Sequence, residues 1–229
     1  MEATFIRRPN RFLGEVELNG ERYEAHVHDP GRLRGLLYPN NRMLVAKPRV
    51  KKQRKTGLDL LFAWDGRHWI LVNSALHRSV SEKILVDPGL SPCGAVQELV
   101  PEIPYGKGTR FDFYLRSRNG RGCYIEVKGC TFMDSNLVAL FPDAPTERGV
   151  RHLEELMDVL GQGFHAVLLI LVFRPDARSF SPNEQCDPGF SRVFHEGVRR
   201  GIKVYAKRID FKKGWFVYTG DIPVDGSGM

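Results

Sequence analysis

Two charged residues, Glu126 and Lys128, stand in the middle of a stretch that otherwise has the composition of a buried strand, CYIEVKGC (Cys123–Cys130). Burying an ionised carboxylate or ammonium group is costly unless each group has partners. Alternate residues of a strand share one face, so Glu126 and Lys128 point one way while Ile125 and Val127 point into the core. The pattern therefore predicts that the charged pair has a specific task.

A third charged residue, Asp112, lies in the preceding strand-like segment, TRFDFYLRS (Thr109–Ser117), where it alternates with apolar residues. The two segments are linked by a loop in which Arg118–Gly120 fits a three-residue turn with glycine in the left-handed position. That turn pairs residues whose numbers sum to 238, which places Asp112 opposite Glu126. A two-residue Asn-Gly turn would instead pair Asp112 with Val127 and mix the apolar and polar faces.

Two carboxylates that face each other repel, at a cost of roughly 0.2–1 kcal/mol on an ordinary sheet surface, and a divalent cation would remove that cost. Mg²⁺ binds one or two carboxylates and keeps water or phosphate oxygens as its other ligands. Lys128, on the same face, is placed to orient a metal-bound water or to stabilise a phosphate. Asp112, Glu126 and Lys128 therefore suit metal-assisted hydrolysis of a phosphodiester. An ion-pair ladder on a solvated sheet surface explains the same pattern equally well.

Further polar residues fall on two predicted helices. Glu82 precedes the sheet, where it either brings a third carboxylate to the pair or remains a solvated helix residue. Arg148, His152 and Glu155 stand at i, i+4 and i+7 of a later helix, on the side opposite its apolar stripe. They either border a phosphate site or form a solvated helix surface.

The elements that must position these residues begin near residue 74. Apolar spacing and capping residues such as Thr146 predict helices at 74–85, 146–160 and 190–200. Strand-like segments lie at 96–106, 109–117, 122–130, 166–173 and 202–209. This order predicts an α/β (α+β) domain in which helices pack on a mixed sheet.

The first 75 residues have a different pattern, with little helix beyond one turn near residues 31–37. Asn19-Gly20 and Asp65-Gly66 are hairpin signals between short strand-like segments. About five such strands predict a small β-barrel of the OB type, with an SH3-like barrel as the alternative. We therefore predict two domains, residues 1–75 and 76–229.

The charge distribution separates the same two parts. Residues 1–79 contain 15 Lys/Arg and 8 Asp/Glu, which accounts for the whole net charge of +7, whereas residues 80–229 contain 19 of each. The run KPRVKKQRK lies in the predicted barrel and favours binding to a polyanion. Its basic residues are Lys47, Arg49, Lys51, Lys52, Arg54 and Lys55. Trp64 and Trp69 either stack on bases or belong to the barrel core.

Composition excludes several classes of protein. No apolar run approaches the roughly 20 residues of a membrane helix, and the N-terminus lacks a secretory apolar region, so we expect a cytoplasmic protein without membrane partners. None of the four cysteines forms a C-x-x-C pair, which predicts free thiols and neither a zinc site nor a redox motif.

Several of these motifs together resemble the sugar fermentation stimulation protein (SfsA) family. They are RFDFYL, CYIEVKGCT and FPDAPTERGVRHLEEL, with NRFLGEVEL, GRLRGLL, RKTGLDL and VNSALHRSVSEKIL before them. The resemblance covers most of the chain. Two stretches depart from the family pattern: HDPG at His28–Gly31 replaces Pro-Asn-Thr-Gly, and GCTF follows Lys128 in place of a small-Val-Thr-Leu sequence.

The resemblance implies an N-terminal OB-like domain and a C-terminal restriction-endonuclease-like domain similar to the PD-(D/E)xK nuclease superfamily. By motif position, the catalytic residues implied are Glu82, Asp112, Glu126 and Lys128, with Mg²⁺ or Mn²⁺ held by the three carboxylates. Asp143, Arg148 and His152 are implied to support that site.

We accordingly expect a DNA-binding protein with a nuclease-like metal site and a link to the regulation of sugar (maltose) utilisation. The alternative is an active Mg²⁺- or Mn²⁺-dependent endonuclease of DNA or RNA. The superfamily also includes members that bind without cutting, so a retained site does not by itself establish cleavage. The sequence leaves open whether the nucleic acid is single- or double-stranded and whether the protein is a homodimer.

Overall fold

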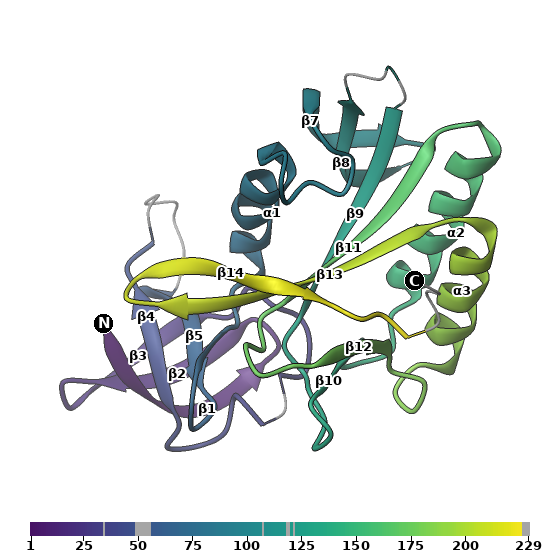
Figure 1. Cartoon of the computed structure of the whole chain (residues 1–229). Helices are drawn as coiled ribbons and strands as arrows, with labels where there is room; N and C mark the ends of the chain where they lie inside the picture. Colours follow the sequence, from purple (N-terminus) through teal and green to yellow (C-terminus); the bar gives the residue numbers. More distant parts are fainter. Residues whose placement is uncertain (34, 49–55, 107, 118–119, 121, 226–229) are drawn as a thin grey trace.

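The structure is a computed structural model that describes residues 1–33, 35–48, 56–106, 108–117, 120 and 122–225 (Figure 1). Its N-terminal part is a five-stranded barrel, as the sequence predicts. The barrel closes because β1 pairs with β2 and β4, and β5 pairs with β4 and β3. The strands are β1 (Glu2–Asn10), β2 (Leu13–Leu18), β3 (Glu21–His26), β4 (Arg42–Ala46) and β5 (Leu58–Trp64), and β6 (Trp69–Leu71) pairs with β5 outside the ring.

Local sequence explains the hairpins of the barrel. Asn19 and Gly20 connect β2 to β3 with φ angles of 56° and 81°, the positive values that a tight two-residue hairpin turn requires. The predicted helical turn is present where the N–H groups of Leu36 and Leu37 both donate to the carbonyl of Leu33. β1 was not predicted as a strand, because only Ala3 and Phe5 of its nine residues are buried and the alternation is weak.

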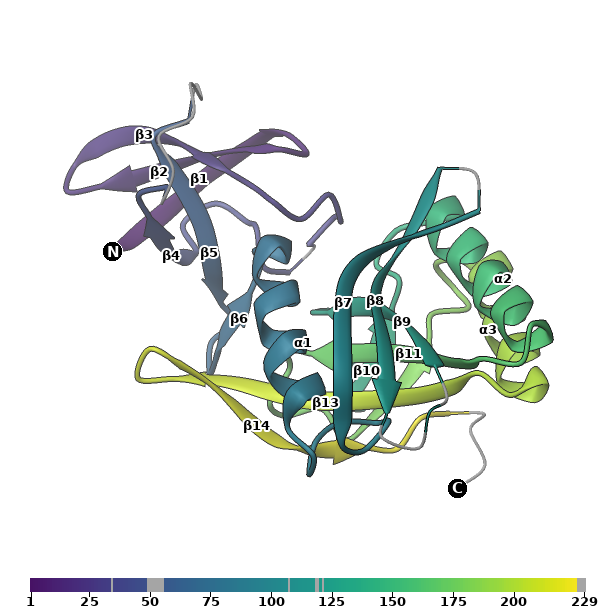
Figure 2. The same cartoon turned by 90° about the horizontal axis from the view of Figure 1, so that it is seen from above.

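A short helix joins the barrel to the second part of the chain. The 3₁₀ turn η1 (Ser74–Leu76) leads into α1 (His77–Val86), which buries Val80, Ile84 and Leu85 and ends before Asp87. Seen from above, α1 stands between the barrel and the second sheet (Figure 2). It therefore packs where the predicted domain boundary lies.

The second part is built on a mixed six-stranded sheet in the order β14-β13-β11-β9-β8-β7. Strands β9, β11 and β13 run parallel, while β7, β8 and β14 pair antiparallel with their neighbours. The bounds are β7 (Val96–Tyr105), β8 (Thr109–Ser117), β9 (Gly122–Cys130), β11 (His165–Val172), β13 (Lys203–Lys212) and β14 (Trp215–Ile222). A separate parallel pair, β10 (Val138–Phe141) and β12 (Ser179–Pro182), and strand β14 were not predicted.

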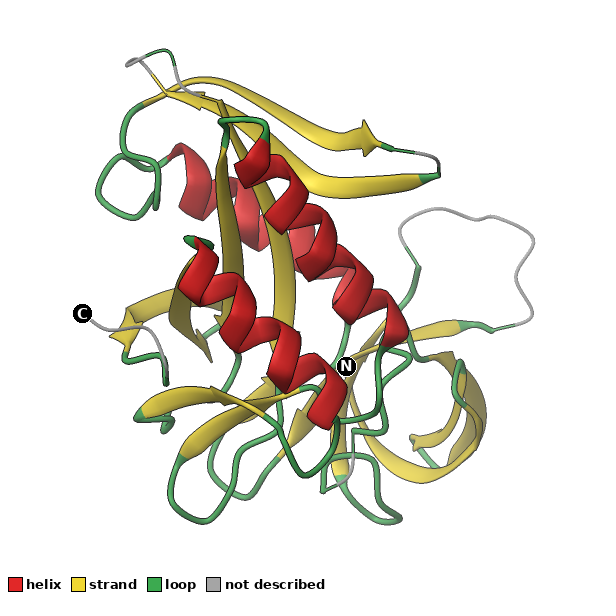
Figure 3. Cartoon of the chain, turned by 90° about the vertical axis from the view of Figure 1, so that its right-hand side faces the viewer, coloured by secondary structure: helices red, strands yellow, loops and turns green. Residues whose placement is uncertain are grey.

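Helices cover both faces of this sheet, which confirms the predicted α/β architecture. α2 (Glu147–Gly161) and α3 (Pro188–Arg200) lie side by side on one face, and α1 packs on the other (Figures 1 and 3). The hydroxyl of Thr146 accepts the N–H of Gly149 and the carboxylate of Asp187 accepts that of Phe190, so both helices begin with a side-chain cap. No helix in the described part of the chain is long and apolar enough to cross a membrane.

One hydrophobic core connects the barrel with the face of the sheet that α1 covers. The hairpin formed by β13 and β14 extends to the barrel (Figure 2). The ring of Phe211 in this hairpin stacks on Phe62 of the barrel, with centroids 3.9 Å apart. Because the barrel, α1 and the second sheet all contribute residues to this core, the core restricts how the barrel is oriented relative to the sheet.

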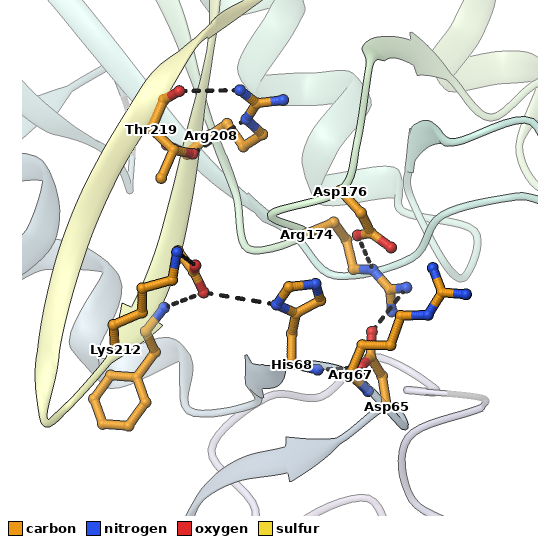
Figure 4. Close-up of polar contacts among 10 residues, drawn as sticks. Asp65, Arg67, His68, Arg174, Asp176, Arg208, Lys212 and Thr219 are labelled. Carbon is orange, nitrogen blue, oxygen red and sulfur yellow. Dashed lines mark hydrogen bonds and ion pairs between the residues drawn. The ribbon is translucent and has the colours of Figure 1, made fainter.

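A polar junction lies next to this core (Figure 4). Arg174, which follows β11, pairs with Asp65 of the β5–β6 turn at 3.0 Å, and both side chains are largely buried. On the β13 side, the buried carboxylate of Asp210 lies 2.8 Å from the ammonium of Lys212 and 4.0 Å from the ring of His68. The Arg174–Asp65 and His68–Asp210 contacts join residues that are far apart in the sequence.

Candidate active site

Strands β8 and β9 meet in the predicted register. The observed pairs run from Phe113 opposite Ile125 to Arg116 opposite Gly122, and each pair of numbers sums to 238. Gly120 has a φ angle of 85°, as the predicted turn requires. Extending the same register by one residue brings Asp112 to Glu126, although the regular pairing ends at Phe113.

Asp112 is a largely buried carboxylate with one backbone partner. Its Oδ2 accepts the N–H of Val127 at 2.7 Å. The pKa of Asp112 is raised to about 6, mainly by burial and then by the negative charge of Glu126, against the lowering effects of the Val127 N–H and of Lys128. The site therefore holds two carboxylates close enough for one to hinder the ionisation of the other, as the sequence register predicts.

Glu126 lies deeper, with a side chain only 3% exposed. Its Oε1 accepts a hydrogen bond from Lys128 Nζ at 2.6 Å and contacts Nδ1 of His152. Burial alone would raise the pKa of Glu126, but the Lys128 charge and the hydrogen bond with His152 outweigh burial and lower it. The ion pair of the alternative interpretation is thus present, but it is buried instead of lying on a solvated sheet surface.

His152 connects this carboxylate to helix α2. Arg148 Nε donates to His152 Nε2 at 3.3 Å, which assigns the ring proton to Nδ1, facing Glu126. His152 is 2% exposed and belongs to the buried face of α2, so the prediction that it lies opposite the apolar stripe is wrong. The reason is that Glu126 gives a polar ring a hydrogen-bonding partner inside the core.

Asp112 faces a cavity of about 390 Å³ between α1, β7, β8 and the start of α2. The cavity residues are Ser74, Ala75, His77, Arg78, Glu102, Asp112, Phe113, Val127 and Arg148. Two arginines, Arg78 and Arg148, give it positive charge in the neighbourhood of the carboxylates. A cavity of this composition suits a ligand that carries phosphate.

The second carboxylate of this cavity is Glu102, which the sequence did not single out. Glu102 has a φ angle of 54°, and its charge also raises the pKa of Asp112. Glu82, the predicted third carboxylate, pairs with Arg78 at 3.0 Å and is not among the cavity residues. Arg78 also lies 3.7 Å from Glu102, so one guanidinium holds both carboxylates.

His77 is a second cavity residue that the sequence did not single out. Its Nε2 is buried and finds no hydrogen-bond partner within the described ranges, and its ring stacks on Phe173. Burial lowers the pKa of His77 to about 4, so the ring is neutral at physiological pH. His77 lies in the VNSALHRSVSEKIL motif, but no spacing in the sequence relates His77 or Glu102 to Asp112, since the fold alone brings them together.

The carboxylates of Asp112 and Glu126 fit a divalent cation in one further respect. Glu126 Oε2 is buried without a hydrogen-bond partner among the described residues, which leaves a carboxylate oxygen available as a ligand. Across the described ranges no group of three His, Cys, Asp and Glu side chains converges as a metal site. A cation held here would therefore take two protein carboxylates and complete its shell with water or substrate oxygens.

Asp143, predicted to support this site, lies elsewhere. Its Oδ2 accepts the N–H of Leu33 at 2.9 Å, and it lines a different cavity of about 690 Å³ together with Arg32 and residues 181–186. The departure at His28–Gly31 occurs beside it, since Asp143 and Asp29 crowd Gly31. Asp143 therefore fastens the barrel loop to the second part of the chain.

The predicted nucleic-acid-binding run is described only at its start. Lys47 is exposed, and Arg49, Lys51, Lys52, Arg54 and Lys55 lie outside the described residues. Trp64 and Trp69 pair across β5 and β6, are half-buried, and lie under the guanidinium of Arg42 at 5.1 and 5.4 Å. This arrangement leaves both ring stacking and core packing as roles for the tryptophans.

Comparison with protein families covers almost the whole chain. Residues 6–72 match the SfsA N-terminal OB domain, and residues 71–214 match the sugar fermentation stimulation protein RE domain. The first match identifies the closed barrel as OB-like.

Individual relatives agree with these matches. A sugar fermentation stimulation protein homolog of Methanococcoides burtonii is 40% identical over 98% of this chain and 92% of its own length. The homolog of Saccharolobus solfataricus is 42% identical over 97% and 85%. Among solved structures, SfsA of Pyrococcus furiosus in complex with Ca²⁺ superposes with a TM-score of 0.86 at 25% identity, covering 98% of this chain and 95% of that one.

Proposed function

The chain belongs to the sugar fermentation stimulation protein family, and we propose that it is a DNA-binding protein whose second domain holds a divalent cation between Asp112 and Glu126. The observation that carries the cation site is the pairing of two buried carboxylates, one with a raised pKa and one with an unpartnered oxygen. The Ca²⁺ named with the Pyrococcus furiosus structure supports a cation of the same class here.

The basic run supports the DNA-binding part of the proposal. Six Lys/Arg in nine residues belong to the N-terminal part of the chain, and residues 1–79 carry the whole net charge of +7. OB folds bind single strands by combining a basic groove with aromatic side chains, and phosphate contacts carry no sequence information. Both DNA forms and RNA are therefore candidates. The family name points to sugar utilisation, which this chain would influence through the nucleic acid that its barrel binds.

Metal-dependent cleavage is the second candidate function, and the position of Lys128 favours it. Bound Mg²⁺ or Mn²⁺ would supply an activated water and neutralise phosphate charge. Lys128 Nζ, held by Glu126, is an ammonium that can orient that water or donate to a phosphate oxygen. Arg78 and Arg148 line the cavity beside Asp112 and can bind a phosphate group.

DNA binding is tested by neutralising the run with the quadruple substitution Lys51→Gln, Lys52→Gln, Arg54→Gln and Lys55→Gln. For each phosphate that the variant no longer neutralises, the slope of log K against log salt should fall by about 0.9 for duplex DNA or about 0.7 for single strands. The control neutralises four exposed residues of the second domain: Lys83, Arg178, Arg192 and Arg199. An unchanged slope in the first variant would remove the run from the interface.

Cleavage is tested by incubating single- and double-stranded DNA and RNA with Mg²⁺, Mn²⁺ or chelator. Asp112→Asn should retain DNA binding and lose any metal-dependent cleavage. Cleavage that persists in this variant, or in chelator, would come from a different site. Absence of cleavage by the wild type together with metal-induced stabilisation would leave a binding protein with a retained cation site.

A further inference from the structure

Two of the four cysteines lie against each other although they are 30 residues apart in the sequence. Cys93 belongs to the loop between α1 and β7, and Cys123 is the second residue of β9. Their sulfur atoms lie 3.0 Å apart and share a hydrogen bond. A disulfide has a sulfur–sulfur bond of about 2.05 Å, so the atoms need to approach by only ~1 Å.

The pair opens onto a cavity of about 490 Å³ that is separate from the one beside Asp112. Its lining includes His165, which lies opposite Cys123 in the sheet, and Lys203 at the start of β13. Both of these side chains are exposed, so small solutes can reach the cavity. The thiolate is the reactive form of a cysteine.

The two thiols differ from each other and from the remaining cysteines. Hydrogen bonding with Cys123 lowers the pKa of Cys93, while the same bond and burial raise the pKa of Cys123. Cys130, in contrast, is fully enclosed, and burial raises its pKa to about 12. Cys93 is therefore suited to react first and Cys123 to react second.

We propose that Cys93 and Cys123 form a thiol–disulfide site that hydroperoxides oxidise. The Cys93 thiolate attacks one oxygen of hydrogen peroxide, whose O–O bond breaks, to give a sulfenic acid and hydroxide, which takes up a proton to become water. Cys123 then attacks the sulfenic sulfur, forms the S–S bond and releases a second water. In total, two thiols and one peroxide give one disulfide and two waters.

The disulfide would close the chain around a functional hairpin. The segment between the two cysteines contains all of β7 and β8, and therefore Glu102 and Asp112. A cross-link around this segment restricts the unfolded chain and ties the loop after α1 to β9. Oxidation should accordingly stabilise the protein, and this expectation holds whether or not the neighbouring carboxylates bind a cation.

The test treats reduced full-length protein with hydrogen peroxide, unfolds it in denaturant, blocks the remaining thiols with N-ethylmaleimide and measures intact mass and non-reduced peptides. We expect a loss of two hydrogens, two blocked thiols in place of four, and one cross-linked peptide that joins Cys93 to Cys123. The melting temperature should rise by about 5–10 °C and return to its original value with dithiothreitol.

Matched serine variants decide the assignment. Cys93→Ser and Cys123→Ser should each abolish the cross-link and the rise in melting temperature, whereas Cys186→Ser should retain both. A cross-link that involves Cys186 or Cys130 would overturn the proposal. So would wild-type protein that gains oxygen atoms on Cys93 without forming a disulfide, because the second thiol would then fail to respond.

Discussion

Replacing Asp112 with asparagine should stabilise the metal-free protein. The pKa of Asp112 rises from its ordinary value of 3.8 to about 6, mainly through burial and then through the charge of Glu126. Each pKa unit corresponds to 1.36 kcal/mol, so above pH 6 the ionised carboxylate lowers the free energy of unfolding by about 3 kcal/mol. Asparagine keeps an oxygen that can accept the Val127 N–H, so the substitution removes the charge and retains the hydrogen bond.

The pH dependence of this effect has a definite sign. A carboxylate whose folded pKa is raised loses stability as pH rises from about 4 to about 6, because the folded state retains a proton that the unfolded state releases. Asp112→Asn should therefore be more stable than wild type by about 1–3 kcal/mol at pH 7.5 and equal to it near pH 4. Urea unfolding in chelator at both pH values measures the difference. Asp158→Asn, an exposed aspartate of α2, should change stability by less than about 0.5 kcal/mol.

A divalent cation should reverse the order of stability, so that wild type becomes more stable than Asp112→Asn. Binding stabilises the folded state by RT ln(1 + [L]/Kd), about 2.7 kcal/mol at a cation concentration of 100 Kd. Mg²⁺ or Mn²⁺ should thus raise the melting temperature of wild type and release a proton near pH 6, while Asp112→Asn should respond weakly or not at all. If Asp112→Asn destabilises the protein and neither protein responds to millimolar cation, the carboxylate is structural and the cation site is refuted.

Three other substitutions test the surroundings of the site and of the core. Lys128→Met should lower the stability of metal-free protein by about 3–5 kcal/mol in urea unfolding, because a buried carboxylate loses its partner, and it should still permit cation binding. Glu102→Gln should weaken cation-induced stabilisation more than Glu82→Gln, since only Glu102 lines the Asp112 cavity; an equal loss would restore Glu82 as the third carboxylate. Arg174→Met should cost about 3–5 kcal/mol because it removes the charged partner of the buried Asp65, whereas Arg7→Met in an exposed ion pair should cost less than about 1 kcal/mol.

The sequence predicted the register of β8 against β9 because the alternation of apolar and polar residues in both strands specifies it. Apolar residues at every second position of β8 and β9 leave one register in which both faces remain consistent, and the structure has this register. Thr146 likewise predicted the start of α2, since its hydroxyl satisfies a free backbone N–H. Local rules of this kind act within one element or one hairpin, so they need no knowledge of the distant chain.

The composition of the cavity could not be predicted in the same way. Glu102 reaches Asp112 through the pairing of β7 with β8, and His77 through the packing of α1 on the sheet. Both placements depend on tertiary contacts that leave no spacing in the sequence. For Asp143 the sequence was misleading. It stands close to Arg148 in one motif, but in the structure its carboxylate accepts the N–H of Leu33 in the barrel loop.

The two carboxylates provide an argument that joins stability to function. Glu126 contributes to the fold, because Lys128 and His152 compensate its burial and lower its pKa. Asp112 is different: its raised pKa means that the fold would be more stable with a neutral residue there. Positions that lower stability in this way are concentrated at sites of ligand binding and catalysis, where the missing partner is the ligand. A cation is the partner that would reverse the cost at Asp112 and also satisfy the unpartnered oxygen of Glu126.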